Sequence, residues 1–191
     1  MDPWVARLAR LFRAHPAWCE AAALIDARAT SNVFFTHRPG EVWHLARRGS
    51  ETLLLPGAAA APDFVFRFTP AAISRLESVR GDAGDFAAEL LELALAEDPT
   101  TRVDIRIAAG FARLAARGYV RLLLASGARV RALGAAHGVT GLRGLQSLVA
   151  ALRTSRASDW ETASPSASAE RDPGSGDAGA LRAANADRRR R

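Results

Sequence analysis

The spacing of apolar positions near the start of the chain predicts two helices. Apolar side chains recur every three or four positions over residues 4–12, which is the spacing of one helix face. The dipeptide Asp2-Pro3 precedes them, and a carboxylate followed by proline is typical of a helix N-terminus. Pro16 then begins an alanine-rich stretch that we expect to be helical to about Ala27.

Beyond these helices the period shortens to the alternation that is typical of strands. Four strands are predicted, over residues 32–37, 41–47, 52–55 and 64–68. Turn signals at Arg38-Pro39-Gly40 and Arg48-Gly49-Ser50 separate the first three. The fourth strand places Phe64, Phe66 and Phe68 on one face, which is the most apolar surface predicted in the chain.

Helical spacing returns after Thr69-Pro70, where a helix is expected to follow the strand directly. The remaining elements are a helix that begins near Asp82 and ends at Asp98-Pro99, a strand over 102–107, a helix over about 108–125, and a last helix over 142–152. Gly118 weakens the predicted helix over about 108–125. Residues 129–138 are expected to form a short strand or a turn. Together the pattern predicts an α+β fold, with about five mostly antiparallel strands in one sheet covered by helices.

The composition changes after Arg153 and marks a predicted domain boundary. Residues 154–191 are rich in Ser, Pro and Gly and contain little apolar material besides Trp160 and Leu181. Such a segment buries too little surface to offset its chain entropy. We therefore expect a single domain over residues 1–153 and a disordered polar tail over residues 154–191.

Arginine alone supplies the basic charge, since the chain has 26 arginine residues and no lysine. A Walker A loop, a kinase-type β3 lysine and a Schiff-base lysine are therefore excluded. The net charge of +6 favours an anionic partner, but the charge is dispersed. Residues 1–153 carry 19 arginines against 14 acidic residues, and the tail carries 7 against 6.

The residue types needed for catalysis do not come together in the sequence. Cys19 is the sole cysteine, no histidine pair has the i, i+4 spacing of a helical zinc site, and no Gly-x-Ser-x-Gly elbow occurs. We expect no enzymatic activity, no catalytic residue, no metal and no cofactor. The N-terminus does not have the pattern of a signal peptide, and no long apolar window occurs, so we expect a cytoplasmic protein.

The strand-rich segment resembles the sterol carrier protein type-2 domain family over about residues 30–125. The most characteristic piece is a strand that leads directly into a helix. Asp63 lies six residues before Thr69 in this piece, and Pro70 follows Thr69. The other matching stretches are Val33-Phe34-Phe35, Gly40-Glu41-Val42-Trp43-His44-Leu45, Leu53-Leu54-Leu55-Pro56-Gly57 and Arg102-Val103-Asp104-Ile105-Arg106-Ile107. Glu97-Asp98-Pro99 is similar to a tripeptide that some relatives, including accessory factors of ubiquinone biosynthesis, carry before the last strand.

Two features depart from the family's pattern. Ala109-Gly110-Phe111 stands where the family usually has a Gly-Asp pair, and the predicted helix over 142–152 extends beyond the usual end. The resemblance implies a non-catalytic carrier that holds an apolar ligand between its sheet and its helices. A sterol, an acyl chain or an isoprenoid quinone precursor is the ligand class that it implies.

Eleven apolar residues are candidates to contact such a ligand, on the predicted sheet face and on the helices that cover it. They are Phe34, Trp43, Leu45, Phe64, Phe66, Phe68, Ile73, Phe86, Leu90, Phe111 and Leu114. The alternative for each is that it fills a closed core, because apolar stripes usually indicate packing.

Two other functions remain open. Arg113, Arg117 and Arg121 fall on one face of the predicted helix, where they could contact nucleic acid or an anionic membrane. Tyr119 is the only aromatic residue among them, so base stacking has little support and nucleic acid is the weaker of the two. The sheet could instead bind a protein partner. The sequence does not predict an oligomeric state.

Overall fold

The computed structural model describes residues 2–136. Groups of helices and groups of strands follow one another along this part of the chain. In chain order they are α1 (Pro3–Ala14), α2 (Pro16–Ala23), β1 (Ser31–Phe35), β2 (Arg38–Arg48), β3 (Glu51–Pro56), β4 (Phe64–Phe68), α3 (Pro70–Ser78), α4 (Ala83–Leu95), β5 (Asp104–Ile107), α5 (Phe111–Ala116), α6 (Tyr119–Ala125) and α7 (Gly127–Ala136). The helix predicted over 142–152, the boundary at Arg153 and the tail lie outside the described residues.

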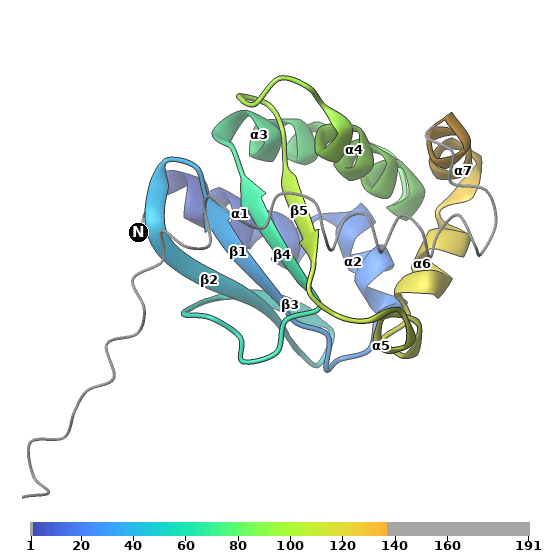
Figure 1. Cartoon of the computed structure of the whole chain (residues 1–191), viewed down its shortest axis with the longest axis horizontal. Helices are drawn as coiled ribbons and strands as arrows, with labels where there is room; N and C mark the ends of the chain where they lie inside the picture. Colours follow the sequence, from blue (N-terminus) through green and yellow to red (C-terminus); the bar gives the residue numbers. More distant parts are fainter. Residues whose placement is uncertain (1, 137–191) are drawn as a thin grey trace, which may run out of the picture.

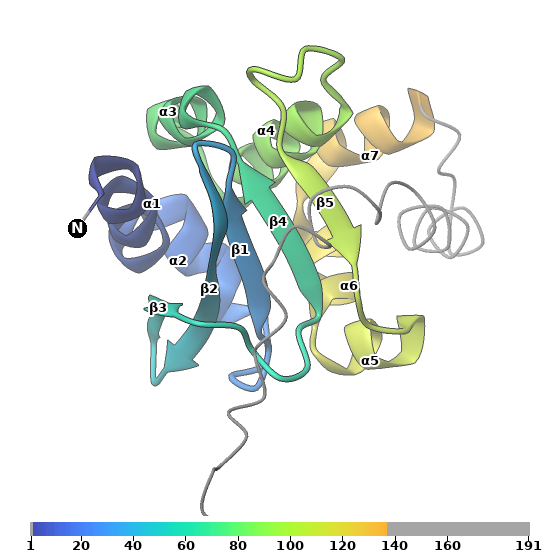
Figure 2. The same cartoon turned by 60° about the vertical axis from the view of Figure 1, so that its left-hand side comes forward.

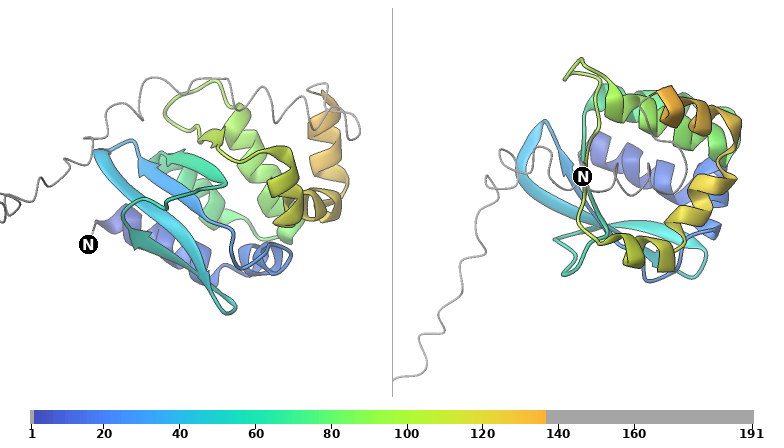
Figure 3. Two further views of the ribbon diagram at one scale, coloured as in Figure 1. Left: turned by 60° about the horizontal axis from the view of Figure 1, so that its bottom comes forward. Right: turned by 45° about the vertical axis from the view of Figure 1, so that its right-hand side comes forward.

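The five strands form one sheet in the order β3-β2-β1-β4-β5 (Figure 1). Neighbouring strands are antiparallel except for the central pair, β1 and β4, which run parallel with Ser31 opposite Phe64. The helices gather on one face of the sheet, as Figures 2 and 3 show. The predicted α+β fold, with a mostly antiparallel sheet of five strands covered by helices, is confirmed.

Side-chain caps begin three of the helices at the predicted positions. The Asp2 carboxylate accepts hydrogen bonds from the backbone amides of Trp4 and Val5, and it lies before the proline that starts α1. Thr69 accepts from the amide of Ala72 at the start of α3, and Asp82 caps α4 in the same way. Helix α3 therefore begins directly after β4, as the sequence predicts.

The inner face of the sheet is divided between a filled core and a more open region. Toward the C-terminal ends of β1 and β4, Phe35 and Phe68 are fully buried against α1 and α3. The helices contribute Leu8, Ile73 and Leu76 to the same cluster, each with no exposed surface. The open region lies toward the other end, where β1 and β4 begin.

The prediction of a single helix over residues 108–125 is wrong, because the helix is interrupted at Gly118 and forms two helices, α5 and α6. Gly118 has φ 88°, a left-handed conformation that other residues adopt at a cost. Its Cα lies against the α2–β1 connection, where an added Cβ would be 2.3 Å from the carbonyl oxygen of Leu24. The sequence pattern does not report this close approach between distant segments.

The prediction of a strand or turn over residues 129–138 is also wrong, since α7 spans most of that range. This helix packs against α4, and Arg129 Nη2 lies 2.7 Å from the Glu92 carboxylate of that helix. The helix predicted to run to about Ala27 ends earlier, at Ala23. The predicted strand over 102–107 is confirmed for its second part, Asp104–Ile107.

Gly118→Ala is expected to destabilise the fold much more than Gly57→Ala. The two glycines have nearly equal φ angles, 88° and 89°, but nothing lies within 4 Å of a Cβ built at Gly57. We expect a loss of about 1–2 kcal/mol at Gly57 from the left-handed backbone alone. The steric clash at Gly118 should raise the loss there to about 3 kcal/mol. Urea unfolding monitored by circular dichroism measures both, and equal losses would contradict the close approach.

Candidate functional site

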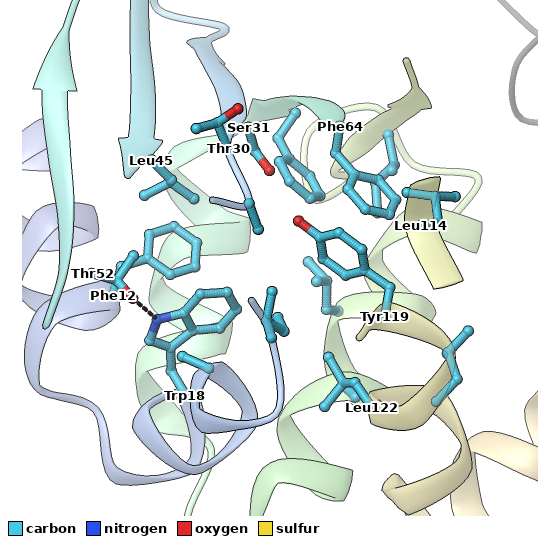
Figure 4. Close-up of a pocket in the computed structure, with 18 of the residues that line it drawn as sticks. Phe12, Trp18, Thr30, Ser31, Leu45, Thr52, Phe64, Leu114, Tyr119 and Leu122 are labelled. Atoms are coloured by element: carbon cyan, nitrogen blue, oxygen red, sulfur yellow. Dashed lines mark hydrogen bonds between the residues drawn. The ribbon is translucent and has the colours of Figure 1, made fainter. Parts of the chain in front are cut away.

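A cavity of about 250 Å³ occupies the open region between the sheet and the helices (Figure 4). Its wall is almost entirely apolar, and it opens partly to the surface. A dry apolar cavity of about 150 Å³ is large enough for benzene, whereas drug-sized ligands occupy about 300 Å³ or more. The volume therefore suits a small apolar molecule, or one segment of a longer molecule that continues through the opening.

The sheet supplies one wall through the alternate residues of β4. Phe64, Phe66 and Phe68 follow one another along that strand, with ring centroids 5.7 and 5.8 Å apart. Ile105 and Ile107 of β5 extend the wall beside them. Strand geometry turns every second side chain to the same face, so the sequence alternation builds this surface directly.

The first two helices supply the opposite wall. Trp18 of α2 packs edge-on against Phe12 of α1, with their ring centroids 4.6 Å apart. Its Nε1 donates to the Thr52 hydroxyl at 3.2 Å, so the polar atom of the indole is satisfied within the protein (Figure 4). Leu90 of α4 also contributes to the lining.

Asp63, the residue directly before β4, is fully buried beside this region. Its Oδ1 lies 2.7 Å from Nε of Arg113 on α5, an ion pair that is not aligned as a hydrogen bond. Its Oδ2 accepts from the Thr30 amide at 3.3 Å and from the Tyr119 hydroxyl at 3.4 Å. The carboxylate thereby connects the starts of β1 and β4 to α5 and α6.

Tyr119 places a hydroxyl group inside the largely apolar cavity. Its ring packs edge-on against Phe64, with centroids 4.8 Å apart, and its hydroxyl points toward Ser31 (Figure 4). Burial, followed by the nearby negative charge of Asp63, raises the pKa of Tyr119 well above its ordinary value. The phenol is therefore neutral, and it is a hydrogen-bonding group rather than a base.

Two arginine side chains, from β2 and α6, bond to the end of α2 and the α2–β1 connection. Arg47 lines the cavity and donates from Nη1 to the carbonyl oxygens of Ala22 and Ile25, the latter at 2.7 Å. Arg121 donates to the carbonyl of Leu24 at 2.7 Å. These bonds attach β2 and α6 to carbonyl groups at the end of α2 and in the connection that follows it.

Seven of the eleven predicted ligand-contact residues line the cavity. They are Leu45, Phe64, Phe66, Phe68, Leu90, Phe111 and Leu114. The structure brings these residues together, and contact with a ligand stays a prediction for each of them.

The other four predicted residues do not line the cavity. Phe34 alternates with Val33 and Phe35 on β1 and therefore lies on the opposite face of the sheet. Ile73 and Phe86 are buried in the filled core. Trp43 packs against that same core; it lies two residues before Leu45 on β2, opposite Val33. For Trp43, Ile73 and Phe86 the alternative of core packing describes what the structure shows, whereas Phe34 is buried on the other face of the sheet.

Several lining residues were not predicted from the sequence. Phe12 and Trp18 were assigned only to helical segments, and Tyr119, Leu122 and Leu123 were assigned to a continuous helix. The apolar stripe of α1 was a usable signal for Phe12. The α6 residues gave no such signal, because their position depends on the break at Gly118.

The three arginines predicted as a surface ridge each contact acceptors within the protein. Arg113 contacts Asp63, Arg117 Nη1 lies 3.7 Å from the Asp26 carboxylate, and Arg121 donates to a backbone carbonyl. They do not share one helix face, because the helix breaks between the second and the third. Their role in contact with an anionic surface stays a prediction.

Within residues 2–136, no three His, Cys, Asp or Glu side chains come close enough together to hold a metal ion. His37 pairs with the Asp2 carboxylate at 3.2 Å, and His44 contacts the carbonyl of Gly57 at 2.9 Å. In the same part of the chain, no helix combines the length and the apolar character that crossing a membrane requires.

No family model matches the sequence, and a search of curated proteins finds no match. Among solved structures, the chain is similar to a protein described as a UbiJ-SCP2 ubiquinone synthesis protein, with 13% sequence identity and a TM-score of 0.37. The similarity covers 60% of this chain and 81% of that protein. A likeness this remote assigns neither a ligand nor an activity to the chain.

Arg113→Met is expected to destabilise the fold by about 3 kcal/mol, because it leaves the Asp63 carboxylate buried without its cation. The double variant Asp63→Asn/Arg113→Met should recover much of that loss, since no charge then remains to be compensated. Arg121→Met is the control, because that side chain is exposed and bonds only a carbonyl. Denaturant unfolding measures all three, and a double variant no more stable than Arg113→Met would contradict the buried pair.

The ionisation of Tyr119 can be followed directly, because it is the only tyrosine in the chain. In the folded protein the tyrosinate absorbance should appear only at a pH well above 10, the ordinary value. After denaturation it should appear at about pH 10. Because the folded pKa is the higher one, the contribution of Tyr119 to stability is fully present below about pH 10 and is lost as the pH rises above it. A folded-state titration at pH 10 or lower would contradict the burial of the hydroxyl.

Proposed function

We propose that the protein binds an apolar, lipid-like molecule in the cavity between its sheet and its helices, without changing that molecule chemically. The observation that carries the proposal is the cavity itself, a space of about 250 Å³ with an almost wholly apolar wall. Empty apolar space costs stability, because the wall loses contacts that a filled core would make. A bound apolar molecule would supply those contacts and bury the exposed wall.

Within the lipid-like class, an acyl or isoprenoid chain suits the cavity better than a sterol. The volume lies below the roughly 300 Å³ at which drug-sized ligand sites begin, and a rigid fused-ring molecule cannot bend to use a narrow space. A flexible chain places one segment inside and continues through the opening. A quinone precursor with an isoprenoid tail belongs to the same group.

The polar groups of the cavity support binding rather than catalysis. The pKa of Tyr119 is raised, which keeps the phenol protonated and leaves no phenolate to act as a base, and the Asp63 carboxylate is already paired with Arg113. Trp18 and Thr52 bond to each other. No nucleophile on the described part of the wall lies beside a base that would activate it.

Contact with an anionic membrane is a further part of this proposal. Leu124 of α6 is 73% exposed, and Leu123 is 37% exposed while it also lines the cavity. An exposed apolar helix face at the wall of a lipid site gives a ligand a route from a bilayer. Nucleic-acid binding has less support, because Arg113, Arg117 and Arg121 are engaged within the fold. A protein partner on the sheet remains an alternative.

Ala87→Phe is expected to weaken ligand binding at least about tenfold, because Ala87 lines the cavity and a benzyl group would fill part of it. The probe is a fluorescent fatty acid titrated into the full chain, in solution and in anionic vesicles. Organic extraction with mass spectrometry identifies any ligand that copurifies. Ala116→Phe, at an exposed position of α5 outside the cavity, should bind the probe as the unaltered chain does.

Circular dichroism and an unfolding curve establish that both variants are folded. A protein that yields no extracted lipid and binds no probe would overturn the proposal. Equal affinity of folded Ala87→Phe and Ala116→Phe would place the probe elsewhere and would overturn it as well.

A further inference from the structure

The face of the sheet opposite the described helices has two buried apolar side chains at its centre. Phe34 of β1 and Val65 of β4 point to this outer face, because they alternate with residues of the core and of the cavity wall (Figure 2). Phe34 is 8% exposed, and Val65 has no exposed surface. An antiparallel sheet with one solvated face usually places polar residues there. The burial of a phenylalanine on this face therefore indicates that other atoms lie over it.

The connection between β3 and β4 lies over the start of the outer face. In that connection, the amide of Ala59 donates to the side-chain oxygen of Asn32 at 2.8 Å. Asn32 is the register partner of Val65, so this bond holds the connection at the level of the buried valine. Phe34 lies two residues farther along β1, beside Arg67, and therefore beyond that level. The cover of Phe34 is to be sought elsewhere in the chain.

The same part of the outer face has an excess of positive charge. The Asp104 carboxylate accepts from Nε of Arg102 at 2.7 Å and from Nε of Arg67 at 2.8 Å. Arg106 is two residues farther along β5 than Asp104, and it is the register partner of Val65. Among the described residues, β4, β5 and the approach to β5 thus bring three guanidinium groups and one carboxylate to this region. An apolar group flanked by carboxylates would complement it in both apolar character and charge.

The chain contains such a group beyond the described residues, in the tripeptide Asp159-Trp160-Glu161. Trp160 is the only Phe, Tyr or Trp in residues 137–191, and a carboxylate adjoins it on each side. Residues 137–158 connect the tripeptide to the end of α7. With the predicted helix over 142–152 at about 1.5 Å per residue and the rest extended at about 3.3 Å per residue, this connection reaches about 50 Å. A small domain is about 30 Å across, so the tripeptide can reach the outer face.

We propose that residues 159–161 dock on the outer face of the sheet, with Trp160 over Phe34 and the two carboxylates directed to the arginines of β4 and β5. Aromatic packing and charge-assisted hydrogen bonds together stabilise such a contact. The inference goes beyond the proposed lipid binding and does not depend on it, because the cavity lies on the other face. The rest of the tail keeps the composition that predicts disorder. The docked segment occupies the sheet surface that a protein partner would otherwise use.

A glutamate-specific protease tests the docking in the full chain, because Glu161 lies in the docked segment and Glu170 lies nine residues beyond it. Cleavage of a docked site requires undocking, so its rate reports the undocked population. Mass spectrometry follows both cleavages, and each rate is divided by the rate at the same site in the denatured chain. We expect cleavage after Glu161 to be at least about tenfold slower than cleavage after Glu170, because undocking exposes the apolar surface of Trp160.

Three variants locate the contact. Trp160→Ala should make the two normalised rates equal. Arg106→Glu turns an attraction into a repulsion and should speed cleavage after Glu161 about fivefold, the usual upper effect of a surface ion pair, without changing cleavage after Glu170. Arg10→Glu makes the same charge reversal at an exposed position of α1, on the other face of the sheet, and should leave both rates unchanged. Circular dichroism and an unfolding curve establish that the variants are folded.

Each of three outcomes would overturn the docking. Equal normalised rates after Glu161 and Glu170 in the unaltered chain would show that the segment is not docked. Full protection of Glu161 in folded Arg106→Glu would place the segment elsewhere on the molecule. Protection that is lost on dilution would assign the outer face to the tail of a second copy. None of these results bears on lipid binding, which the fluorescent fatty acid tests separately.

Discussion

The burial of one carboxylate, that of Asp63, constrains the whole region around the cavity. A charge with no exposed surface has to be compensated where it lies, and three elements supply the compensation. Arg113 of α5 forms an ion pair with the carboxylate, and the Tyr119 hydroxyl of α6 and the Thr30 amide, just before β1, donate hydrogen bonds to it. The backbone of Asp63 adds to this, since its amide donates to the carbonyl of Thr30 and its carbonyl accepts from Ala108 and Ala109. The two short helices after β5, α5 and α6, are therefore attached to the starts of the central strands β1 and β4.

This attachment explains why an apolar cavity persists between well-packed layers. On the sheet side, Phe64 and Phe66 belong to a strand hydrogen-bonded on both sides, so they cannot move inward alone. On the helix side, the bonds of Arg47 and the contact at Gly118 hold the α2–β1 connection in place. Each wall is attached at its ends, and the side chains between them cannot collapse together. Surroundings that relax only partly leave a cavity, as large-to-small substitutions in protein cores show.

The sequence predicted the sheet well because its signals are local. Alternation placed Phe64, Phe66 and Phe68 on one face, and Asp2, Thr69 and Asp82 indicated helix starts that the structure confirms. The cavity was predicted only in part, since periodicity reports which face a residue is on and not how far along that face a core is filled. Ile73 and Phe66 have the same apolar character in the sequence. Ile73 lies on α3 in closed packing, and Phe66 lines open space.

The positions that the pattern missed depend on contacts between distant segments. Gly118 breaks the helix because it meets Leu24, more than ninety residues earlier, and no local rule reports that. The ion pair between Asp63 and Arg113 likewise joins a loop to a later helix. The pattern presented that arginine as part of an exposed ridge, because a solvated face and a buried partner produce the same spacing. Charge spacing therefore indicates a helix face and leaves open what the face touches.

The composition of α6 shows how the cavity and the fold depend on each other. This helix is almost wholly apolar, yet none of its residues is fully buried, and Val120, Leu122 and Leu123 line the cavity instead. In a closed core such side chains would stabilise the helix through packing, which is the main source of stability for short helices. Here the space beside these side chains is open, so packing cannot hold α6. The contact of Gly118 with Leu24 and the hydrogen bond of Tyr119 to Asp63 hold the helix instead. A molecule in the cavity would supply the missing packing, and any ligand that binds only the folded state stabilises it by mass action. The apolar helix over an open space is therefore the element whose stability would depend most on whether the cavity is occupied.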